Sequence, residues 1–215
     1  MSELDTIAQK IISALEVKNA ARERALSASR KVVQHSAHTI RAAHRAEFDE
    51  AAKLLAQART VADEMRASVK DYPDLYHAGY VQDALKEVAE ASIVTALVQG
   101  QPLPDPDALG VEYDSYLNGM GEAAGELRRH ALDLMRLGRT REAEATLQWM
   151  EDIFSVLTVV DFPDAITGGL RRTADMVRGV LERTRGELTM VMKQEELMAA
   201  LKLNQKDDPL KEGLG

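Results

Sequence analysis

Apolar residues recur at three- and four-residue spacing along almost the whole chain, and no stretch alternates apolar and polar residues. This spacing places apolar side chains on one face of an α-helix, whereas a half-buried strand would need alternation. The longest uninterrupted pattern, from about Glu3 to Arg45, carries Ile7, Ile11 and Leu15 on one stripe. Such a length is unusual for a globular helix and indicates a bundle or a contact between subunits. The pattern therefore predicts an all-α fold with a long first helix.

Prolines and glycines divide the rest of the chain into further helices. The clearest loop is QGQPLPDPDAL, residues 99–109, which holds three of the six prolines. Because Pro and Gly interrupt helices, each such break ends one helix and precedes the next. After the first helix we expect helices at 48–69, 75–97, 113–137 and 141–159, and two more over 165–203. The sequence thus predicts one bundle of about seven helices over residues 1–204, followed by a flexible polar tail at 205–215.

Length and composition exclude several classes of protein. A chain of 215 residues suits one domain with a substantial core. It has no cysteine, hence no disulfide, no thiolate metal site and no cysteine nucleophile. No P-loop or glycine-rich dinucleotide turn is present. No apolar run approaches the roughly 20 residues of a membrane helix, and the N-terminus lacks the order of a signal peptide. We therefore expect a soluble, cytoplasmic protein.

Positive charge is concentrated in one segment of an otherwise acidic chain. The formal net charge is −8, which argues against contact with phosphates. Residues 17–46, however, hold seven Lys or Arg residues against Glu23 alone, a net charge of 7 − 1 = +6, together with three histidines. The basic residues are Lys18, Arg22, Arg24, Arg30, Lys31, Arg41 and Arg45. They form either a solvated helix face or a surface that binds nucleic acid.

Three carboxylates share one face of the helix expected at 75–97. Asp83, Glu87 and Glu90 stand at i, i+4 and i+7. The same face continues through apolar Val94 and Leu97, so it should turn inward or against a neighbouring helix. Carboxylates that approach a buried face repel one another unless a cation neutralises them, and Mg²⁺ prefers such oxygen ligands. The alternative is an ordinary acidic surface turn, partly balanced by Lys86.

The helix expected at 113–137 carries a second acidic pair and three glycines. Glu122 and Glu126 are like charges one turn apart. Gly119, Gly121 and Gly125 lie within two turns, and each costs a helix roughly 1 kcal/mol relative to alanine. Close approach of another helix, or access for a ligand, would offset that cost.

Several segments resemble the translin family. The stretch SRKVVQHSAHTIRAAHR, residues 29–45, looks like the first long helix of translin and of translin-associated factor X. KEVAEA, residues 86–91, resembles the carboxylate-bearing helix of the latter. DSYLNGMGEAAGELRR, residues 114–129, is similar to the most recognisable run of the family, a Tyr-Leu-x-Gly followed by Gly/Ser-Glu-Leu. The resemblance covers roughly Ala20 to Glu187.

This resemblance implies a fold, an assembly and an activity. It implies a seven-helix bundle whose subunits form a hollow octamer around single-stranded RNA or DNA. It also implies a Mg²⁺-dependent endoribonuclease site, with Glu87 and Glu90 at two of its acidic positions. Glu122 falls where translin-associated factor X has an aspartate and translin an apolar residue, and Glu126 falls on a glutamate that both share. The side chain of Glu122 is one methylene longer than that of aspartate. Its carboxylate would therefore lie in a different place, and Mg²⁺ requires near-ideal octahedral geometry.

Together these observations predict a single-stranded RNA- or DNA-binding homo-oligomer with a carboxylate nuclease site. Glu87, Glu90 and Glu122 would hold Mg²⁺, or Mn²⁺, which accepts the same ligands. Glu126 would complete the catalytic group or orient a water molecule. The residues expected to contact the nucleic-acid backbone are Arg30, Lys31, His38, Arg41 and Arg45. The alternatives are a nucleic-acid-binding oligomer without catalysis, and a helical assembly protein.

Overall fold

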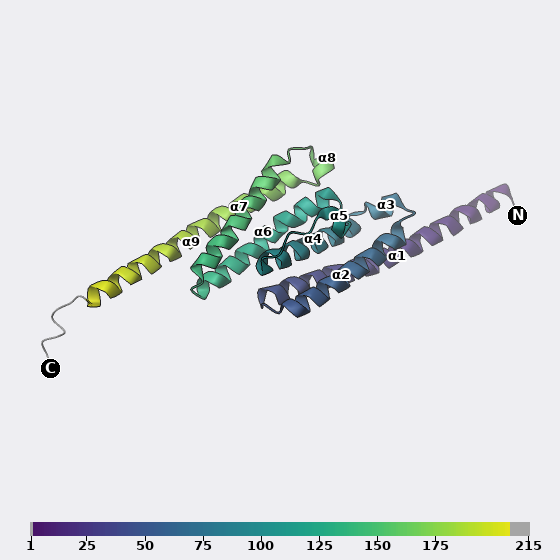
Figure 1. The fold of residues 1–215 in the computed structure, drawn as a ribbon. Coiled ribbons are helices and arrows are strands. Elements are labelled where there is room, and N and C mark those ends of the chain that lie inside the picture. The colour runs from purple at the N-terminus through teal and green to yellow at the C-terminus, as the bar shows by residue number, and fades with distance from the viewer. Residues whose placement is uncertain (1, 207–215) are drawn as a thin grey trace.

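The computed structural model describes residues 2–206, and within this range all regular structure is α-helical (Figure 1). The six long helices are α1 (Glu3–His44), α2 (Phe48–Val69), α4 (Gly79–Gln99), α6 (Tyr113–Arg136), α7 (Thr140–Val159) and α9 (Leu170–Lys206). Three helices of four residues lie between them: α3 (Pro73–Tyr76), α5 (Pro106–Leu109) and α8 (Asp164–Thr167). The all-α prediction, including the long first helix, is confirmed.

The long helices form three packed layers. Helix α1 packs against α2 and α4, α4 packs against α6, and α6 packs in turn against α7 and α9. Figure 1 shows α4 and α6 in the middle, with the α1–α2 pair on one side and the α7–α9 pair on the other. Helices α4 and α6 therefore have neighbours on two sides, which makes their contact the centre of the molecule.

Helix α4 is central because it is apolar almost all round. Every residue from Val88 to Leu97 is buried, and Glu90 is the only charged residue among them. A helix that is apolar on all faces is stable in water only when other helices surround it. The sequence expectation that the face of Glu90 turns inward is thus confirmed.

Helix boundaries differ from the prediction at three places. The helix expected at 75–97 begins at Gly79, because Ala78 is extended and Pro73 starts the separate short helix α3. The proline-rich loop contains α5, whose first turn is capped by the Asp105 carboxylate. Of the two helices expected over 165–203, the first is only the short α8. The expected count of about seven thus becomes six long and three short helices within residues 2–206.

The predicted flexible tail lies mostly outside the described residues. Helix α9 continues to Lys206, so residues 205 and 206 are helical rather than part of a tail. Residues 207–215 lie beyond the described range.

Two helix ends extend beyond the bundle at opposite sides of the molecule (Figure 1). The first buried residue of α1 is Ala21, and the preceding turns expose the apolar side chains of Leu4, Ile7, Ile11 and Leu15. The end of α9 likewise exposes apolar side chains, namely Met190, Leu197, Met198, Leu201 and Leu203. Apolar stripes on protruding helices are typical of surfaces that another chain covers.

Glycines allow α6 to approach its neighbours. A Cβ atom at Gly119 would lie 2.7 Å from the carbonyl oxygen of Lys86 and 3.1 Å from the Ala89 Cβ atom. Gly121 similarly faces the Thr173 side chain of α9. Gly125, by contrast, has no atom within 4 Å of such a Cβ. The expectation of close helix approach is therefore confirmed for the first two glycines and wrong for the third.

We expect Gly119→Ala to destabilise the protein, because its methyl group would force α6 away from the α4 backbone. Overpacking of this kind typically costs about 1–3 kcal/mol. Gly125→Ala adds a methyl group to the same helix in open space, so it should stabilise the protein by up to about 1 kcal/mol. Thermal unfolding checks both variants, with a shift of about 2–4 °C for each kcal/mol at this chain length. Equal midpoints for the two variants would contradict the close approach at Gly119.

Candidate functional site

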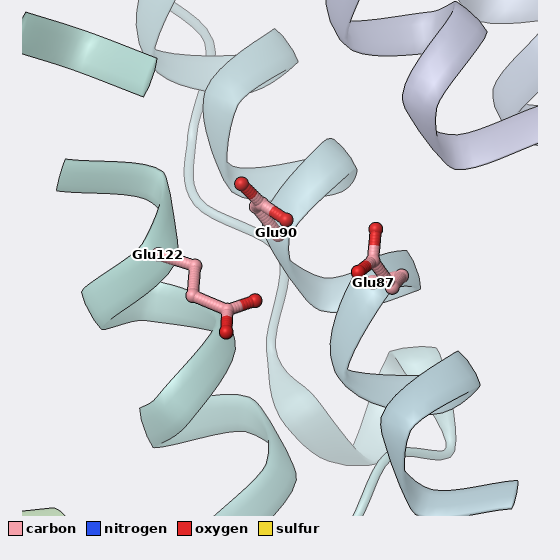
Figure 2. Close-up of side chains that lie close together, drawn as sticks. All are labelled: Glu87, Glu90 and Glu122. Atoms are coloured by element: carbon pink, nitrogen blue, oxygen red, sulfur yellow. The ribbon is translucent and has the colours of Figure 1, made fainter. Parts of the chain in front are cut away.

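Three carboxylates from two helices meet where α6 crosses α4 (Figure 2). Glu87 and Glu90 come from α4, and Glu122 points toward them from α6. One carboxylate oxygen of each residue lies within 4.8 Å of the other two. The spacing of Glu87 and Glu90 places them on one face of α4. The Gly119 contact, one turn before Glu122, brings α6 close enough for the third carboxylate to join them.

Glu90 is the most deeply placed member of this carboxylate cluster. Its side chain belongs to a residue that is only 8% exposed. Within residues 2–206 its carboxylate has no hydrogen bond and no ion pair. Burial raises the pKa of Glu90 to about 8, and the negative charges of Glu87, Glu122 and Glu126 contribute to the rise. Burial and the neighbouring negative charges disfavour the ionised form of this carboxylate, so the position favours a cation or a bound proton.

Glu87 lies in a similar environment but nearer to solvent. Burial is the main cause that raises the pKa of Glu87, the charge of Glu122 adds to it, and Lys86 opposes it. The cluster therefore has more negative charge than its surroundings neutralise.

Lys86 supplies the positive charge next to the cluster. Its Nζ atom donates a hydrogen bond of 2.7 Å to Glu122 Oε1 and lies 4.0 Å from Asp83 Oδ1. Burial lowers the pKa of Lys86, but the hydrogen bond to Glu122 and nearby negative charges outweigh this and leave the pKa raised. Lys86 is thus a cation at neutral pH. Asp83 itself is 74% exposed by its side chain, so it lies outside the cluster that the sequence grouped it with.

Glu126 is held apart from the cluster by a histidine of α1. Its Oε2 atom lies 2.6 Å from Nε2 of His44, whose side chain is only 4% exposed. The hydrogen bond from His44 holds the pKa of Glu126 below its ordinary value. The sequence placed His44 in the basic segment but did not reveal this pairing, because the two residues are 82 positions apart. The structure therefore brings together three of the four predicted catalytic carboxylates.

The donor set of the cluster suits a hard divalent cation. Mg²⁺ takes oxygen ligands at about 2.0–2.1 Å and usually keeps several waters, so three carboxylates are enough protein ligands. Neighbouring oxygens on one octahedral ion lie about 3.0 Å apart, so the three oxygens, which lie within 4.8 Å of one another, would have to approach by up to about 1.8 Å to share one ion. A cation that displaces the Glu90 proton would neutralise the carboxylate charge that burial otherwise disfavours. The residues that are present therefore fit Mg²⁺ or Mn²⁺.

The predicted nucleic-acid contacts are exposed on α1 and just beyond its end. Arg30, Lys31, His38 and Arg41 lie on α1, and Arg45 follows its last residue. Arg45 forms an ion pair with Glu47, whereas Arg30, Lys31 and Arg41 have no ion pair within residues 2–206. Arg30 and Arg41 are eleven residues apart, which is close to three helical turns, so they project from the same face. Free guanidinium groups on one face suit phosphate contacts.

Comparisons with known proteins agree with this architecture. No protein-family model matches the sequence. The uncharacterized protein MJ0175 of Methanocaldococcus jannaschii is 26% identical over 195 residues, covering 89% of this chain and 86% of that protein. The solved structure of AfC3PO in complex with duplex RNA is 31% identical with a TM-score of 0.81, covering 87% of this chain and 97% of that one.

A second structure of AfC3PO, also 31% identical, gives a TM-score of 0.80 over the same shares of the two chains. Apo-NeC3PO shares the fold at 22% identity, with a TM-score of 0.73 over 89% of this chain and 98% of that one. The fold is thus an all-α bundle like those of AfC3PO and NeC3PO. The chain belongs to the translin family. No helix within the described residues is long and apolar enough to cross a membrane.

The raised pKa of Glu90 predicts how stability changes with pH in the absence of metal. Between about pH 4.5 and 8 the folded protein holds a proton on Glu90 that the unfolded chain has lost. The free energy of unfolding should therefore fall as the pH rises through this window, by at most about 1.4 kcal/mol per pH unit for one proton. Glu90→Gln removes the proton exchange and should flatten the curve.

Urea unfolding in EDTA at pH 5, 6, 7 and 8 measures this dependence. Glu144→Gln is the matched control, because Glu144 is an exposed glutamate on α7. The control should follow the unmodified protein. A Glu90→Gln curve that still falls as steeply as the control would show that Glu90 is not the group that holds the proton.

Proposed function

We propose that this chain is an RNA-binding protein that assembles into an oligomer and cleaves RNA endonucleolytically with a divalent cation. The observation that carries the proposal is Glu90, a residue only 8% exposed whose carboxylate has no hydrogen bond or ion pair within residues 2–206 and faces two further carboxylates. A protein maintains such an arrangement at a cost in stability, which is typical of a functional site. The 31% identical AfC3PO has been solved with duplex RNA, which supports RNA as the ligand.

Glu87, Glu90 and Glu122 are the proposed metal ligands. Bound Mg²⁺ or Mn²⁺ would polarise a phosphodiester and lower the pKa of a water molecule. Glu87 and Glu90 would bind the ion from α4, and Glu122 would bind it from α6. Glu126, held by His44, lies outside this set and is proposed to accept a proton or orient a water molecule at the edge of the site.

The exposed basic residues of α1 are the proposed RNA contacts. Arg30 and Arg41 would bind phosphates, while Lys31, His38 and Arg45 would add weaker contacts along the same helix. Few aromatic residues are available for stacking, so we propose recognition of the backbone rather than of bases. The sequence favoured single-stranded RNA or DNA, whereas the AfC3PO complex contains duplex RNA. The preference for single-stranded over duplex nucleic acid stays a prediction, and the experiment below tests it.

The protruding ends of α1 and α9 are proposed as contacts between subunits. Both ends expose apolar stripes that no residue within 2–206 of the same chain covers. Burial of such stripes stabilises helix pairs between chains. An octamer, as the family resemblance implies, would be one such assembly.

A second candidate is an RNA-binding oligomer without catalysis. It is favoured by the ion pair between Lys86 and Glu122, which engages one proposed ligand with a residue of the protein itself. The longer side chain of glutamate in place of aspartate also favours it.

We expect the purified protein to cleave labelled RNA in Mg²⁺ but not in EDTA. Glu87→Gln and Glu122→Gln should lower the cleavage rate at least 100-fold while RNA binding is retained, because each removes a ligand charge. Denaturing gels measure cleavage and native gels measure binding, with single-stranded and duplex RNA of one sequence run in parallel. Glu144→Gln is again the control and should cleave normally. Shifted but intact RNA in Mg²⁺ would leave the second candidate as the function.

We also expect the double substitution Arg30→Ala with Arg41→Ala to weaken RNA binding and its salt dependence. Each lost phosphate contact lowers the slope of log K against log salt by about 0.7 for a single strand, so the slope should fall by about 1.4. The control is Arg141→Ala with Arg183→Ala, which removes the same charge from exposed positions on α7 and α9. A control that loses as much slope as the test pair would mean that overall charge, and not the α1 face, binds RNA.

A further inference from the structure

Lys86 occupies a distinctive place beside the carboxylate cluster. Within residues 2–206 it is the only Lys or Arg that forms an ion pair with Glu87, Glu90 or Glu122. Its Nζ atom lies 2.7 Å from Glu122 Oε1, and its side chain is only 22% exposed. The neighbouring carboxylate Glu126 instead lies 2.6 Å from His44 Nε2 and 4.0 Å from Arg129 Nη1. Lys86 is therefore the counter-ion specific to the cluster.

Lys86 and a bound divalent cation would compete for the same carboxylate, that of Glu122. The hydrogen bond to Lys86 uses one carboxylate oxygen and withdraws negative charge from the other. An ammonium group beside a divalent cation is also repelled by it, most strongly where burial limits screening. Both effects make the ion pair unfavourable once a cation is bound among the three carboxylates.

We propose that Lys86 is a tethered counter-ion that competes with the divalent cation for Glu122, so that metal binding requires Lys86 to withdraw. This inference rests on the proposed metal centre and adds its regulation. Without metal, Lys86 reduces the repulsion among the carboxylates and keeps α4 and α6 together. When metal binds, part of its binding free energy is spent on breaking the ion pair, and the affinity of the site is lower than three carboxylates alone would give.

Lys86 borders a cavity that contains other carboxylates. The cavity, of about 400 Å³, lies on the side of the pair away from Glu87 and Glu90. Its charged lining residues are Lys86, Glu122, Asp83, Asp114 and Arg172. Asp83 Oδ1 is already 4.0 Å from the Lys86 Nζ atom, so a rotation of the lysine side chain exchanges one carboxylate partner for another. Asp83 thus offers the ammonium group a second carboxylate within reach of its side chain.

Manganese binding to the full chain, followed by electron paramagnetic resonance of free Mn²⁺, tests the proposal without any assay of cleavage. Lys86→Met keeps the length of the side chain and removes its charge. It should bind Mn²⁺ at least tenfold more tightly than the unmodified protein, a gain of about 1.4 kcal/mol. Lys86→Gln should behave in the same way. Lys53→Met is the matched control, because it removes one lysine charge from a surface ion pair on α2.

Two further comparisons separate competition from a general effect of charge. In a Glu122→Gln background the gain from Lys86→Met should shrink, because the shared partner is absent and only the repulsion between the ammonium group and the cation remains. In thermal unfolding, Lys86→Met should lower the midpoint in EDTA, where the carboxylates lose their counter-ion, and recover or exceed the unmodified midpoint in excess Mn²⁺.

Each other outcome overturns a specific statement. If Lys86→Met binds Mn²⁺ no more tightly than Lys53→Met, the competition is wrong while the metal centre stands. The competition is also wrong if the full gain persists in the Glu122→Gln background. If neither the unmodified protein nor the Lys86 variants bind Mn²⁺, the metal centre is wrong and the inference falls with it. Binding by the Lys86 variants alone would be the strongest support, since it would mean that the lysine excludes the metal.

Discussion

The contact between α4 and α6 at Gly119 holds three carboxyl groups together, although their charges repel and Glu90 keeps a proton up to about pH 8. Apolar packing around α4 on several sides stabilises this contact, and the absent side chain of Gly119 lets α6 reach the α4 backbone at Lys86. Without that approach Glu122 would be too far from Glu87 and Glu90 to form a cluster. The energy that keeps the acidic site together therefore comes from the hydrophobic core, which is a common arrangement for functional sites that are strained by themselves.

The two glutamates of α6 show how position along one helix determines chemical character. Glu122 and Glu126 are one turn apart, yet Glu122 pairs with a lysine of α4 and Glu126 with a histidine of α1. One carboxylate is thereby placed in a region of excess negative charge, and the other is held by a hydrogen bond that favours its ionised form. The same residue type thus has two environments, because the helix between two layers contacts a different neighbour at each turn.

Local patterns predicted much of this structure, and long-range contacts account for what was missed. The three- and four-residue spacing gave the long helices, and the i, i+3 relation of Glu87 and Glu90 gave two of the three cluster members. The glycines of α6 indicated close packing, although Gly125 faces open space. Short helices such as α5 were missed because capping by Asp105 leaves a weak signal within a proline-rich loop. The pairing of His44 with Glu126, and the exclusion of Glu126 and Asp83 from the cluster, depend on how layers distant in sequence pack, which one sequence does not reveal.

The unbroken length of α1 has a structural consequence. Its 42 residues span about 63 Å at 1.5 Å per residue, with exposed apolar turns at one end and His44 against Glu126 at the other. Only the first turns protrude, because the buried residues from Ala21 to Ala43 fix the rest of the helix against its neighbours. The basic face lies along the same rod. One continuous helix therefore carries the exposed apolar turns, the basic face and the histidine beside the acidic centre.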